Sequence, residues 1–426
     1  PPRGMRDFLP DDKALREGVM AVIRDSFSAF GYREIETPVA EELERLESGE
    51  GGDNEKLIFK ILRRGLDPEA PIPPSEVADL GLRFDLTLPL ARFYATHRGE
   101  LPNVFRAIQM GSVWRAERPQ RGRYRQFTQC DIDVLGEPSI IAEAELIIAM
   151  AATLRRLGVE GSTVRLNDRR ILFGMLDSCG FAPEARLGAL ITVDKLDKIG
   201  LAGVADELRT NGGDSTSVDL LVKLLEDLLA SGGAGATGDR GAGAGRDFDA
   251  VLAALPPAVD EAAGVLVSIR DAVQTVEPEL PMVADPTLVR GMGYYTGPIY
   301  ELAHPASSGS IGAGGRYDGM IGRFAGTDVA ACGFSLGFER VIGLVDAARV
   351  TRTRRQVAVL YDDTVPPPEL LGAQRRLIET GVAARLVRRS RNLGRLLDGL
   401  AEEGFDAFVN LPAADLEPRP LAGRAS

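Results

Sequence analysis

The sequence predicts an α+β fold in which helices flank an antiparallel sheet, a helical segment interrupts that sheet, and a small α/β domain follows. Residues 104–113 form an apolar run and residues 127–134 alternate between polar and apolar side chains, which is typical of two neighbouring antiparallel strands. Residues 169–280 have mainly helical periodicity. Residues 356–411 alternate strand-like and helix-like segments, as a βαβαβ unit does.

Length and composition place the chain among globular proteins. It has 426 residues, of which 44% are hydrophobic and 26% charged, so we expect two or three domains with a large core. We find neither a run of about 18 apolar residues nor a signal-peptide pattern at the amino terminus, and therefore expect no membrane insertion or export. The isolated Cys130, Cys179 and Cys332, far from His97 and His304, predict no disulfide, no structural metal and a cytoplasmic location. The net charge of −12 argues against nonspecific nucleic-acid binding by the whole surface, but not against a local basic patch.

The first 100 residues contain two expected helices and two short strands. Residues 13–30 have apolar side chains at helical spacing and end at Gly31. Residues 32–39 predict a strand closed by Pro38, which fits either an edge strand or a strand at a dimer interface. Residues 41–79 predict a loop-rich insertion with one strand at 57–62, and a second helix is expected from Pro89 to Arg98.

The most polar stretch, residues 111–133, contains five arginines and three glutamines between the two predicted strands. Residues 118–125 are expected to form the loop between them. Arginine forks bind phosphate and carboxylates bind amines, so this hairpin suits a polyphosphate held beside an amino-bearing group. The alternative is a solvated hairpin whose arginines pair with Glu117, Asp131 and Asp133.

The remaining elements follow from periodicity. A core helix is expected at 140–157 and strands at 164–167, 288–302, 310–319 and 332–336; further helices are expected at 171–177, 183–198, 218–230 and 251–276. The glycine-alanine tract 231–245 predicts a flexible loop. A helix is also expected from Gly337 to Ala347 with Arg340 in its first turn, where a cation opposes the helix dipole and favours an anionic partner.

The last domain should begin after an arginine-rich linker at 348–355. Its predicted elements are strands at 356–361, 382–387 and 405–411 and helices at 367–380 and 393–403.

Four segments resemble the class II aminoacyl-tRNA synthetases, and specifically the histidyl-tRNA synthetase family. Residues 105–133 resemble motif 2 of the class, with ERPQRGRYRQF similar to the histidyl members. LVRGMGYYTGPIYE at 288–301 and AGGRYDGM at 313–320 resemble the two histidine-specific signatures, and GFSLGFER at 333–340 resembles motif 3. RGMRDFLP at the start resembles the family's opening segment, and residues 32–39 resemble motif 1, which implies a homodimer.

The resemblance implies a division into domains. Residues 1–165 and 284–347 would form the class II catalytic core, and residues 166–283 a helical insertion that contains the 231–245 loop. Residues 348–426 would form a shortened anticodon-binding-like domain. The arginines at positions 385, 388, 389, 391 and 395 either contact a tRNA backbone there or form a solvated surface.

The resemblance also implies an ATP site. Arg115 and Arg290 would hold the α-phosphate from two sides, together with the substrate carboxylate, and both are expected to be catalytic. Arg340 and Phe127 would enclose the adenine, and Arg123 would contact the terminal phosphates. Glu117 would bind the adenine or Mg²⁺, which accompanies ATP.

A histidine site is implied beside it. Asp85, Thr87 and Gln129 would bind the ammonium, while Asp133 and Tyr295 would face the imidazole. Tyr294 would shape the pocket.

The implied activity is that of a histidine–tRNA ligase, which activates L-histidine with ATP and transfers it to tRNA(His). Two alternatives are open at this point. The short last domain, and Gly293 beside a position where the family usually has an acidic residue, fit an adenylating paralogue with a non-tRNA acceptor. A non-catalytic regulatory subunit of ATP phosphoribosyltransferase would also share the fold, although such paralogues typically lose the arginines found here at 115, 290 and 340.

Overall fold

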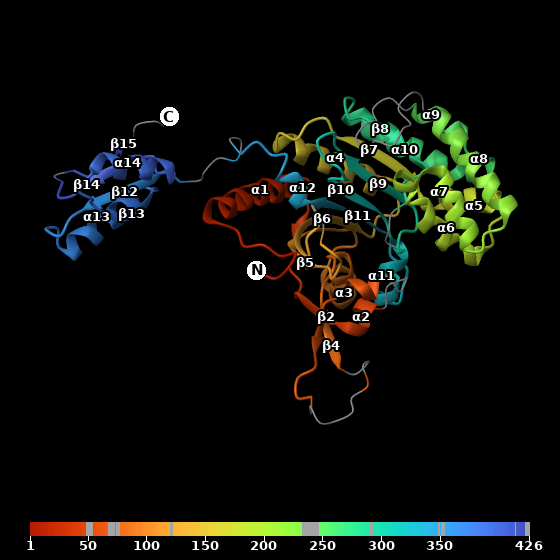
Figure 1. Cartoon of the computed structure of the whole chain (residues 1–426), viewed down its shortest axis with the longest axis horizontal. Helices are drawn as coiled ribbons and strands as arrows, with labels where there is room; N and C mark the ends of the chain where they lie inside the picture. The colour runs from red at the N-terminus through yellow and green to blue at the C-terminus, as the bar shows by residue number, and fades with distance from the viewer. Residues whose placement is uncertain are drawn as a thin grey trace. The chain divides into compact units, whose positions relative to one another are not determined.

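The computed structural model describes residues 1–47, 54–66, 73, 77–119, 122–231, 247–289, 293–347, 350, 354–413 and 415–421. These residues belong to two compact units, Pro1–Arg349 and Val350–Ser426, each with its own core (Figure 1). All of the predicted glycine-alanine loop except Ser231 lies outside the described residues. Among the helices that are described, none is long and apolar enough to cross a membrane.

An eight-stranded sheet forms the centre of the first unit, in the order β1-β5-β6-β11-β10-β9-β7-β8. The strands are β1 (Arg33–Glu34), β5 (Phe105–Trp114), β6 (Gln126–Leu135), β7 (Thr163–Asp168), β8 (Met282–Ala284), β9 (Pro298–Ala303), β10 (Gly312–Arg316) and β11 (Ala331–Gly337). All neighbours are antiparallel except β1–β5 and β7–β8. The predicted antiparallel sheet is therefore confirmed, with parallel strands only at its two edges.

The middle strands place polar residues of β6 on one face of the sheet. Gln129, Asp131 and Asp133 alternate along β6, so their side chains point to the same side. On the neighbouring strand β11, Asp133 is opposite Gly333 and Asp131 is opposite Ser335. Small residues on β11 leave room for these side chains.

Helices cover the sheet and bury its apolar positions. α1 (Pro10–Ala29) buries Val19, Ile23 and Phe27, and it packs against α4 (Ile141–Arg156), which in turn lies on β11. α3 (Thr87–His97) and α11 (Asp318–Ala325) pack together around a cluster that includes Leu90, Phe105 and Ile321.

The helical insertion lies beyond β7 at one end of the sheet (Figure 1). It comprises α5 (Arg169–Ser178), α6 (Arg186–Val193), α7 (Leu196–Thr210), α8 (Ser215–Ser231), α9 (Phe248–Ala253) and α10 (Asp260–Val276), with short 3₁₀ turns at Pro183–Ala185 and Pro257–Val259. A small sheet of β2 (Ala40–Glu42), β4 (Ala78–Leu82) and β3 (Lys60–Leu62) projects at the bottom of the view in Figure 1, together with α2 (Leu43–Glu47).

Several predicted boundaries were wrong for local reasons. The predicted helix 251–276 is two helices, because Pro256 and Pro257 lack the amide protons that a continuous helix needs. The predicted helix 183–198 is a 3₁₀ turn followed by α6 and the start of α7, and Gly200 breaks α7 with a φ of 68°. The predicted strand 32–39 is regular only at Arg33–Glu34, before Pro38.

Near the predicted site, two helices also differed from expectation. The helix expected to run from Gly337 to Ala347 is α12 (Phe338–Val341), which is much shorter. α11 was not predicted, because its glycines at 319 and 322 resemble turn residues in the sequence.

The second unit contains a four-stranded sheet in the order β13-β12-β14-β15. Its elements are β12 (Gln356–Tyr361), α13 (Pro367–Glu379), β13 (Ala383–Arg388), α14 (Leu393–Glu402), β14 (Ala407–Asn410) and β15 (Arg419–Pro420). β12, β13 and β14 are parallel, as predicted, while the short antiparallel β15 was not predicted. Alternate residues of β12 face two separate cores, Val357 and Val359 toward α13 and Ala358 and Leu360 toward α14.

Candidate active site

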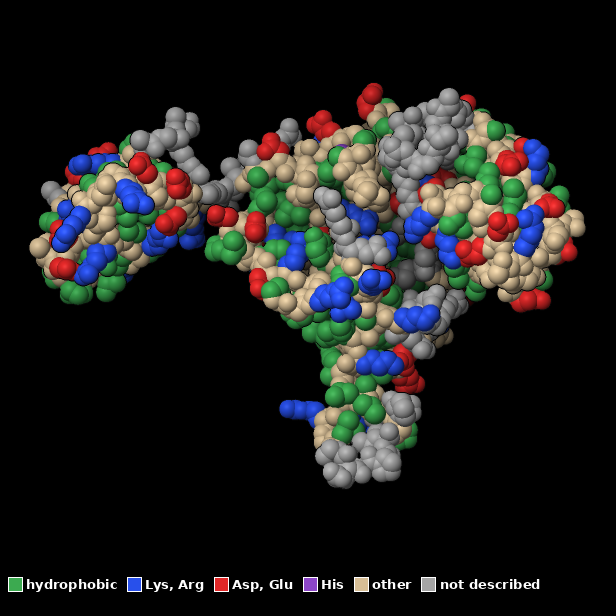
Figure 2. Space-filling model, viewed as in Figure 1, with side chains coloured by type: hydrophobic (Ala, Val, Ile, Leu, Met, Phe, Trp, Pro, Cys, Tyr) green, Lys and Arg blue, Asp and Glu red, His purple; other side chains and the backbone are tan. Residues whose placement is uncertain are grey.

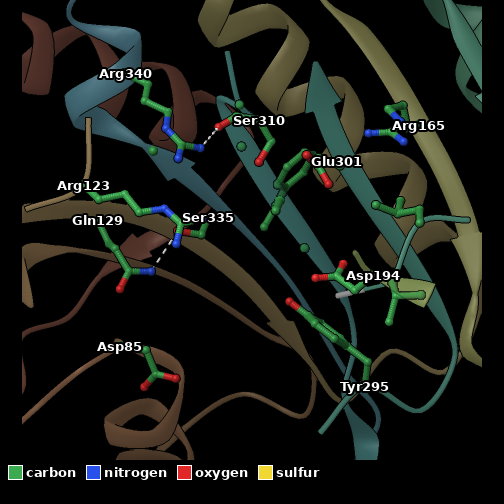
Figure 3. A pocket seen from close by; sticks show the side chains of 18 of the residues that line it. Asp85, Arg123, Gln129, Arg165, Asp194, Tyr295, Glu301, Ser310, Ser335 and Arg340 are labelled. Carbon is green, nitrogen blue, oxygen red and sulfur yellow. Dashed lines mark hydrogen bonds between the residues drawn. The ribbon is translucent and has the colours of Figure 1, made fainter. Parts of the chain in front are cut away.

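A cavity of about 890 Å³ lies in the first unit, on the face of the sheet that carries the polar residues of β6 (Figure 3). Strands β6, β9, β10 and β11, the loop between β5 and β6, the start of α3, and the turn between α6 and α7 all contribute to its wall. Every predicted site residue that the structure describes lines this cavity: Asp85, Thr87, Arg115, Glu117, Arg123, Phe127, Gln129, Asp133, Tyr294, Tyr295 and Arg340. Arg290 lies outside the described residues.

One part of the cavity wall is a cluster of buried hydrogen-bond acceptors. Within the described part of the chain, four oxygen atoms of this wall have no hydrogen-bond partner: Asp85 Oδ2, Gln129 Oε1, Asp131 Oδ1 and Asp133 Oδ2. We call these four residues the acceptor cluster. Buried acceptors without donors are unfavourable, and a ligand with several N–H groups and a positive charge would satisfy them. The cluster therefore fits an ammonium group.

Burial sets the charge state of these carboxyl groups. It raises the pKa of Asp131 well above its usual range, an effect that the nearby Asp133 increases. It also raises the pKa of Asp133 to about 7, against the lowering effect of the Tyr317 hydroxyl. The pKa of Asp85 is raised by burial too, although the Leu88 amide and Arg115 oppose that shift. A bound cation would offset the cost of charging all three groups.

Aromatic side chains hold the deep end of the acceptor cluster. The Tyr317 hydroxyl donates a hydrogen bond of 2.5 Å to Asp133 Oδ1. The ring of Tyr294 lies 4.8 Å from that of Tyr295 and 5.9 Å from that of Tyr317, measured between centroids. Asp133 lies directly against Gly333, where a Cβ atom would come within 2.0 Å of Asp133 Oδ1. Only glycine at 333 leaves space for this carboxylate.

Gln129 connects the acceptor cluster to β11. Its Nε2 donates to Ser335 Oγ at 2.9 Å and to Asp131 Oδ2 at 3.3 Å (Figure 3). These bonds direct its Oε1 into the acceptor cluster. Asp85 is held at the start of α3 by the Leu88 amide, which lies 3.2 Å from its Oδ1.

Arg115 lies beside the acceptor cluster at the end of β5. Its Nε donates to the Phe84 carbonyl at 3.0 Å, and its guanidinium carbon lies 5.0 Å from the centroid of the Phe127 ring. The Arg115 amide also donates to the Arg125 carbonyl at 2.8 Å, which closes the base of the β5–β6 loop. The first residue of the loop is therefore Arg115, whose guanidinium is held in place and lines the cavity.

Arg340 also lines the cavity, at the point where α12 follows β11 directly. Its Nη1 donates to the Ser310 carbonyl (Figure 3). A Cβ atom at Gly309 would come within 3.1 Å of this nitrogen, so the backbone of the 307–310 turn approaches the guanidinium closely. Cations from motif 2 and motif 3 are therefore both present at the cavity.

The structure also brings residues to the cavity that were not predicted. Arg165 and Asp194 lie on the side away from Gln129 in Figure 3, and Glu301 of β9 also lines the cavity. Arg165 Nε donates to Asp285 Oδ2 at 2.6 Å. The helical insertion and the core meet here, and no local motif could have indicated a contact between segments so far apart in sequence. Asp131 and Tyr317, by contrast, were detectable, Asp131 from the alternation of β6 and Tyr317 from the second histidine signature.

The solvated-hairpin alternative does not account for the acidic residues. Asp131 and Asp133 are buried, and their hydrogen bonds involve Gln129 and Tyr317, not the described arginines of the loop.

In the second unit, by contrast, arginines do pair with carboxylates. There Arg385 pairs with Glu403, Arg388 with Asp363 and Arg389 with Asp362, and Figure 2 shows basic and acidic side chains interspersed on this unit. Much of that predicted basic face is therefore neutralised locally.

Three comparisons relate this chain to known proteins. The family model described as histidyl-tRNA synthetase matches residues 4–341. The histidine–tRNA ligase of Leifsonia xyli subsp. xyli is 51% identical over 433 residues, covering 99% of this chain and 98% of that protein. The probable histidine–tRNA ligase of Tropheryma whipplei (strain Twist) is 41% identical over 420 residues, covering 96% and 95%.

Solved structures show the same likeness. The histidyl-tRNA synthetase from Nostoc sp. PCC 7120 superimposes with a TM-score of 0.74 at 27% identity, covering 96% of this chain and 90% of that one. A Bacillus halodurans structure titled as an ATP phosphoribosyltransferase regulatory subunit/histidyl-tRNA synthetase has a TM-score of 0.74 at 20% identity, covering 96% and 97%. At that identity the second likeness shows the shared fold alone.

Proposed function

Because the chain belongs to the histidyl-tRNA synthetase family, we propose that it activates L-histidine with ATP and transfers the histidyl group to tRNA(His). The single observation that carries this proposal is the acceptor cluster beside Arg115. A buried set of oxygens for an ammonium next to a fixed cation for a phosphate is what amino-acid activation requires.

Histidine binds at the acceptor cluster in this proposal. Its ammonium lies among Asp85, Gln129 and Asp131, with Thr87 at the start of α3 nearby. Asp133 and Tyr295 face the imidazole, because an acceptor and a hydroxyl together can recognise both ring nitrogens. Tyr294 forms the wall behind them.

ATP binds between the hairpin loop and α12. A carboxylate oxygen of histidine attacks the α-phosphorus, forms a new P–O bond, and breaks the bond to the β-phosphate oxygen, so pyrophosphate leaves. Arg115 stabilises the charge that develops at the α-phosphate, and Arg290 does so from the other side. Arg123 contacts the outer phosphates, while Phe127 and Arg340 hold the adenine.

Magnesium accompanies ATP in this proposal. Within the described part of the chain no three His, Cys, Asp or Glu side chains are grouped so as to hold a metal ion. The ion would take most of its oxygen ligands from the phosphates and water, as Mg²⁺ commonly does, with Glu117 of the cavity wall as a candidate carboxylate. It would supply neutralisation of the leaving pyrophosphate.

The second unit is proposed to contact the tRNA. Arg391 and Arg395 are exposed near the start of α14, where they can meet a phosphate backbone. The chain is further proposed to act in the cytoplasm as a homodimer joined near β1. The two paralogue alternatives are not favoured, because relatives that match over nearly the full length carry the ligase name.

The test is ATP–pyrophosphate exchange with each of the twenty amino acids, followed by charging of total tRNA in the same samples. Exchange with histidine only, followed by charged tRNA, is the expected result. Asp85→Asn should raise the KM for histidine at least about ten-fold, the loss expected for one charged hydrogen bond, and leave the KM for ATP nearly unchanged. Exchange without charging would indicate a different acceptor, and no exchange would contradict the proposal.

A further inference from the structure

The amino-terminal segment, residues 3–8, lies on the hairpin loop between β5 and β6. The Arg125 amide donates to the Gly4 carbonyl at 2.8 Å. Gly4 has a φ of 84°, and a Cβ atom there would come within 2.9 Å of Arg125 Cγ. The backbone and the side chain of Arg125 thus both contact this segment. The carbonyl of the same Arg125 accepts the hydrogen bond from the Arg115 amide that closes the base of the loop.

Arg6 contacts two elements of the cavity at once. Its guanidinium carbon lies 3.6 Å from the centroid of the Tyr124 ring in the hairpin loop. The same guanidinium donates through Nη2 to Glu339 Oε2 in α12. Glu339 is 7% exposed and Arg6 32%, so the pair is largely shielded from water. Arg6 therefore connects the loop that carries Arg123 to the helix that carries Arg340.

A second arginine, Arg16, also holds Glu339 in place. Arg16 of α1 donates to both oxygens of Glu339, at 2.9 Å and 2.7 Å, and to Thr128 Oγ1 at 3.1 Å. The Thr128 amide donates to Glu339 Oε1 at 3.3 Å. Because α1 and β6 already hold Glu339, the contact from Arg6 constrains the loop and not the helix.

We propose that Arg6 is a positioning residue for ATP. It holds Tyr124 and Arg125 against α12 and so keeps Arg123 of the same loop oriented toward the cavity before the nucleotide binds. Contacts that already order the loop before ATP binds reduce the conformational entropy that is lost on binding. The inference rests on the proposed function, since it assigns the loop to the nucleotide.

The acceptor cluster is independent of Arg6. Asp85, Gln129 and Asp133 are held by the Leu88 amide, Ser335 and Tyr317, and none of these three hydrogen bonds involves residues 3–8. Loss of Arg6 should therefore weaken ATP binding without weakening histidine binding. A general loss of stability would affect both ligands.

The chain provides its own optical probe for the experiment. Trp114 is the single tryptophan of the sequence and is the last residue of β5, directly before the hairpin loop. Its fluorescence, followed during titration with ATP or with histidine, gives dissociation constants that do not depend on turnover.

Three variants of the full chain test the proposal: Arg6→Met, Arg6→Lys and, as the matched control, Arg156→Gln. Arg156 is the last residue of α4, and its ion pair with Asp25 at 2.5 Å is exposed. Arg6→Met should raise the dissociation constant for ATP about ten-fold, the order expected for losing a shielded cation–π contact and an ion pair. Arg6→Lys should show a smaller increase, because an ammonium retains the charge but not the planar stacking. Arg156→Gln should bind both ligands as the unaltered chain does.

Equal ATP affinity in Arg6→Met and the unaltered chain would overturn the inference, and so would an equal loss of ATP and histidine affinity. If Arg6→Met does not fold, Arg6→Lys decides by the same comparison of the two ligands. An unaltered chain without histidine-dependent exchange would contradict the proposed function, whereas the ATP titration would still decide the role of Arg6.

Discussion

Asp133 illustrates how neighbours on adjoining strands determine the properties of one side chain. Its own strand turns it into the cavity, Gly333 on β11 leaves the space for it, and the Tyr317 hydroxyl binds one of its oxygens. Burial outweighs the Tyr317 hydrogen bond and raises the pKa of Asp133 from 3.8 to about 7. In the empty protein this group therefore retains its proton at pH values where an unfolded chain has lost it.

The free energy of unfolding should consequently fall as the pH rises between about 4 and 7. Over that interval the folded chain binds one more proton than the unfolded chain, and above pH 7 the contribution of Asp133 to the slope disappears. Asp133→Asn keeps an oxygen that can accept from Tyr317 but cannot titrate. Between pH 5 and pH 8 the unaltered chain should lose about 2 kcal/mol more stability than the variant.

Urea unfolding without ligand at several pH values measures this difference. Asp85 and Asp131 titrate in both proteins, and because Asp133 also raises the pKa of Asp131, the difference between the two curves reports Asp133 together with its effect on Asp131. Parallel curves would show that Asp133 does not hold a proton in the folded state.

At the level of single residues, the sequence predicted the residues of the candidate site better than it predicted the contacts between distant residues. The alternation along β6 and the resemblance to synthetase motifs indicated Gln129 and Asp133. The ion pair of Arg165 with Asp285 was not predictable, because the two residues are separated by a helical insertion whose path no local pattern describes.

Among the elements, β10 and β11 show why glycine is required in the floor of the site. A Cβ atom at Gly314 would lie 2.1 Å from the Gly333 carbonyl oxygen and 2.5 Å from Tyr300 Cε2. The ring of Tyr300 is itself fixed, since its hydroxyl donates to that same carbonyl at 3.0 Å. β10 and β11 can approach each other this closely only because neither Gly314 nor Gly333 has a side chain.

Gly314→Ala should therefore lower the free energy of unfolding by about 3 kcal/mol, as expected when a methyl group is forced into a packed site. Gly319→Ala in α11 is the matched control. A Cβ atom there meets only Thr296 Cγ2, at 3.8 Å, so the stability should change by less than about 1 kcal/mol, in the favourable direction for a helix. Urea denaturation of both variants measures the contrast, and equal stabilities would contradict the packing argument.

Element boundaries were predictable where one local signal dominates. β12 was predicted to the residue, because an apolar run between charged segments has one interpretation as a strand. The single helix predicted for α9 and α10 was wrong, because apolar periodicity outweighed two prolines whose effect on the helix is decisive.

The whole molecule consists of two units with separate cores, and this separation has an experimental consequence. Every described residue that lines the cavity belongs to Pro1–Arg349. A chain ending at Arg349 should therefore retain histidine-dependent pyrophosphate exchange within about two-fold, since no residue of the cavity is lost. Charging of tRNA should fall at least about a hundred-fold, because the tRNA would bind through the first unit alone and lose the contacts proposed for the second unit.

Exchange and charging are measured on the same preparations of the full and shortened chains. Loss of both activities with a folded product would show that the second unit supports the active site itself. Retention of both would show that the second unit contributes little to tRNA binding.

The class of fold could be predicted because the polar and apolar periodicities agree with it over most of the chain, although α11 and β15 were missed. The meeting of the insertion with the core could not, because it depends on packing between distant segments. The family resemblance supplied the order of the motifs, and the structure supplied their distances.

If histidine binds at the acceptor cluster as proposed, the supply of this amino acid would also affect how long the protein survives. Unsatisfied buried oxygens destabilise the empty chain, and a ligand that satisfies them stabilises the folded state in proportion to the logarithm of its concentration. When a cell is starved of histidine, a larger fraction of these molecules would be open to proteases; when histidine is abundant, the same molecules would persist longer. The turnover of the protein in the cell would then follow the concentration of its own substrate, without any separate regulator.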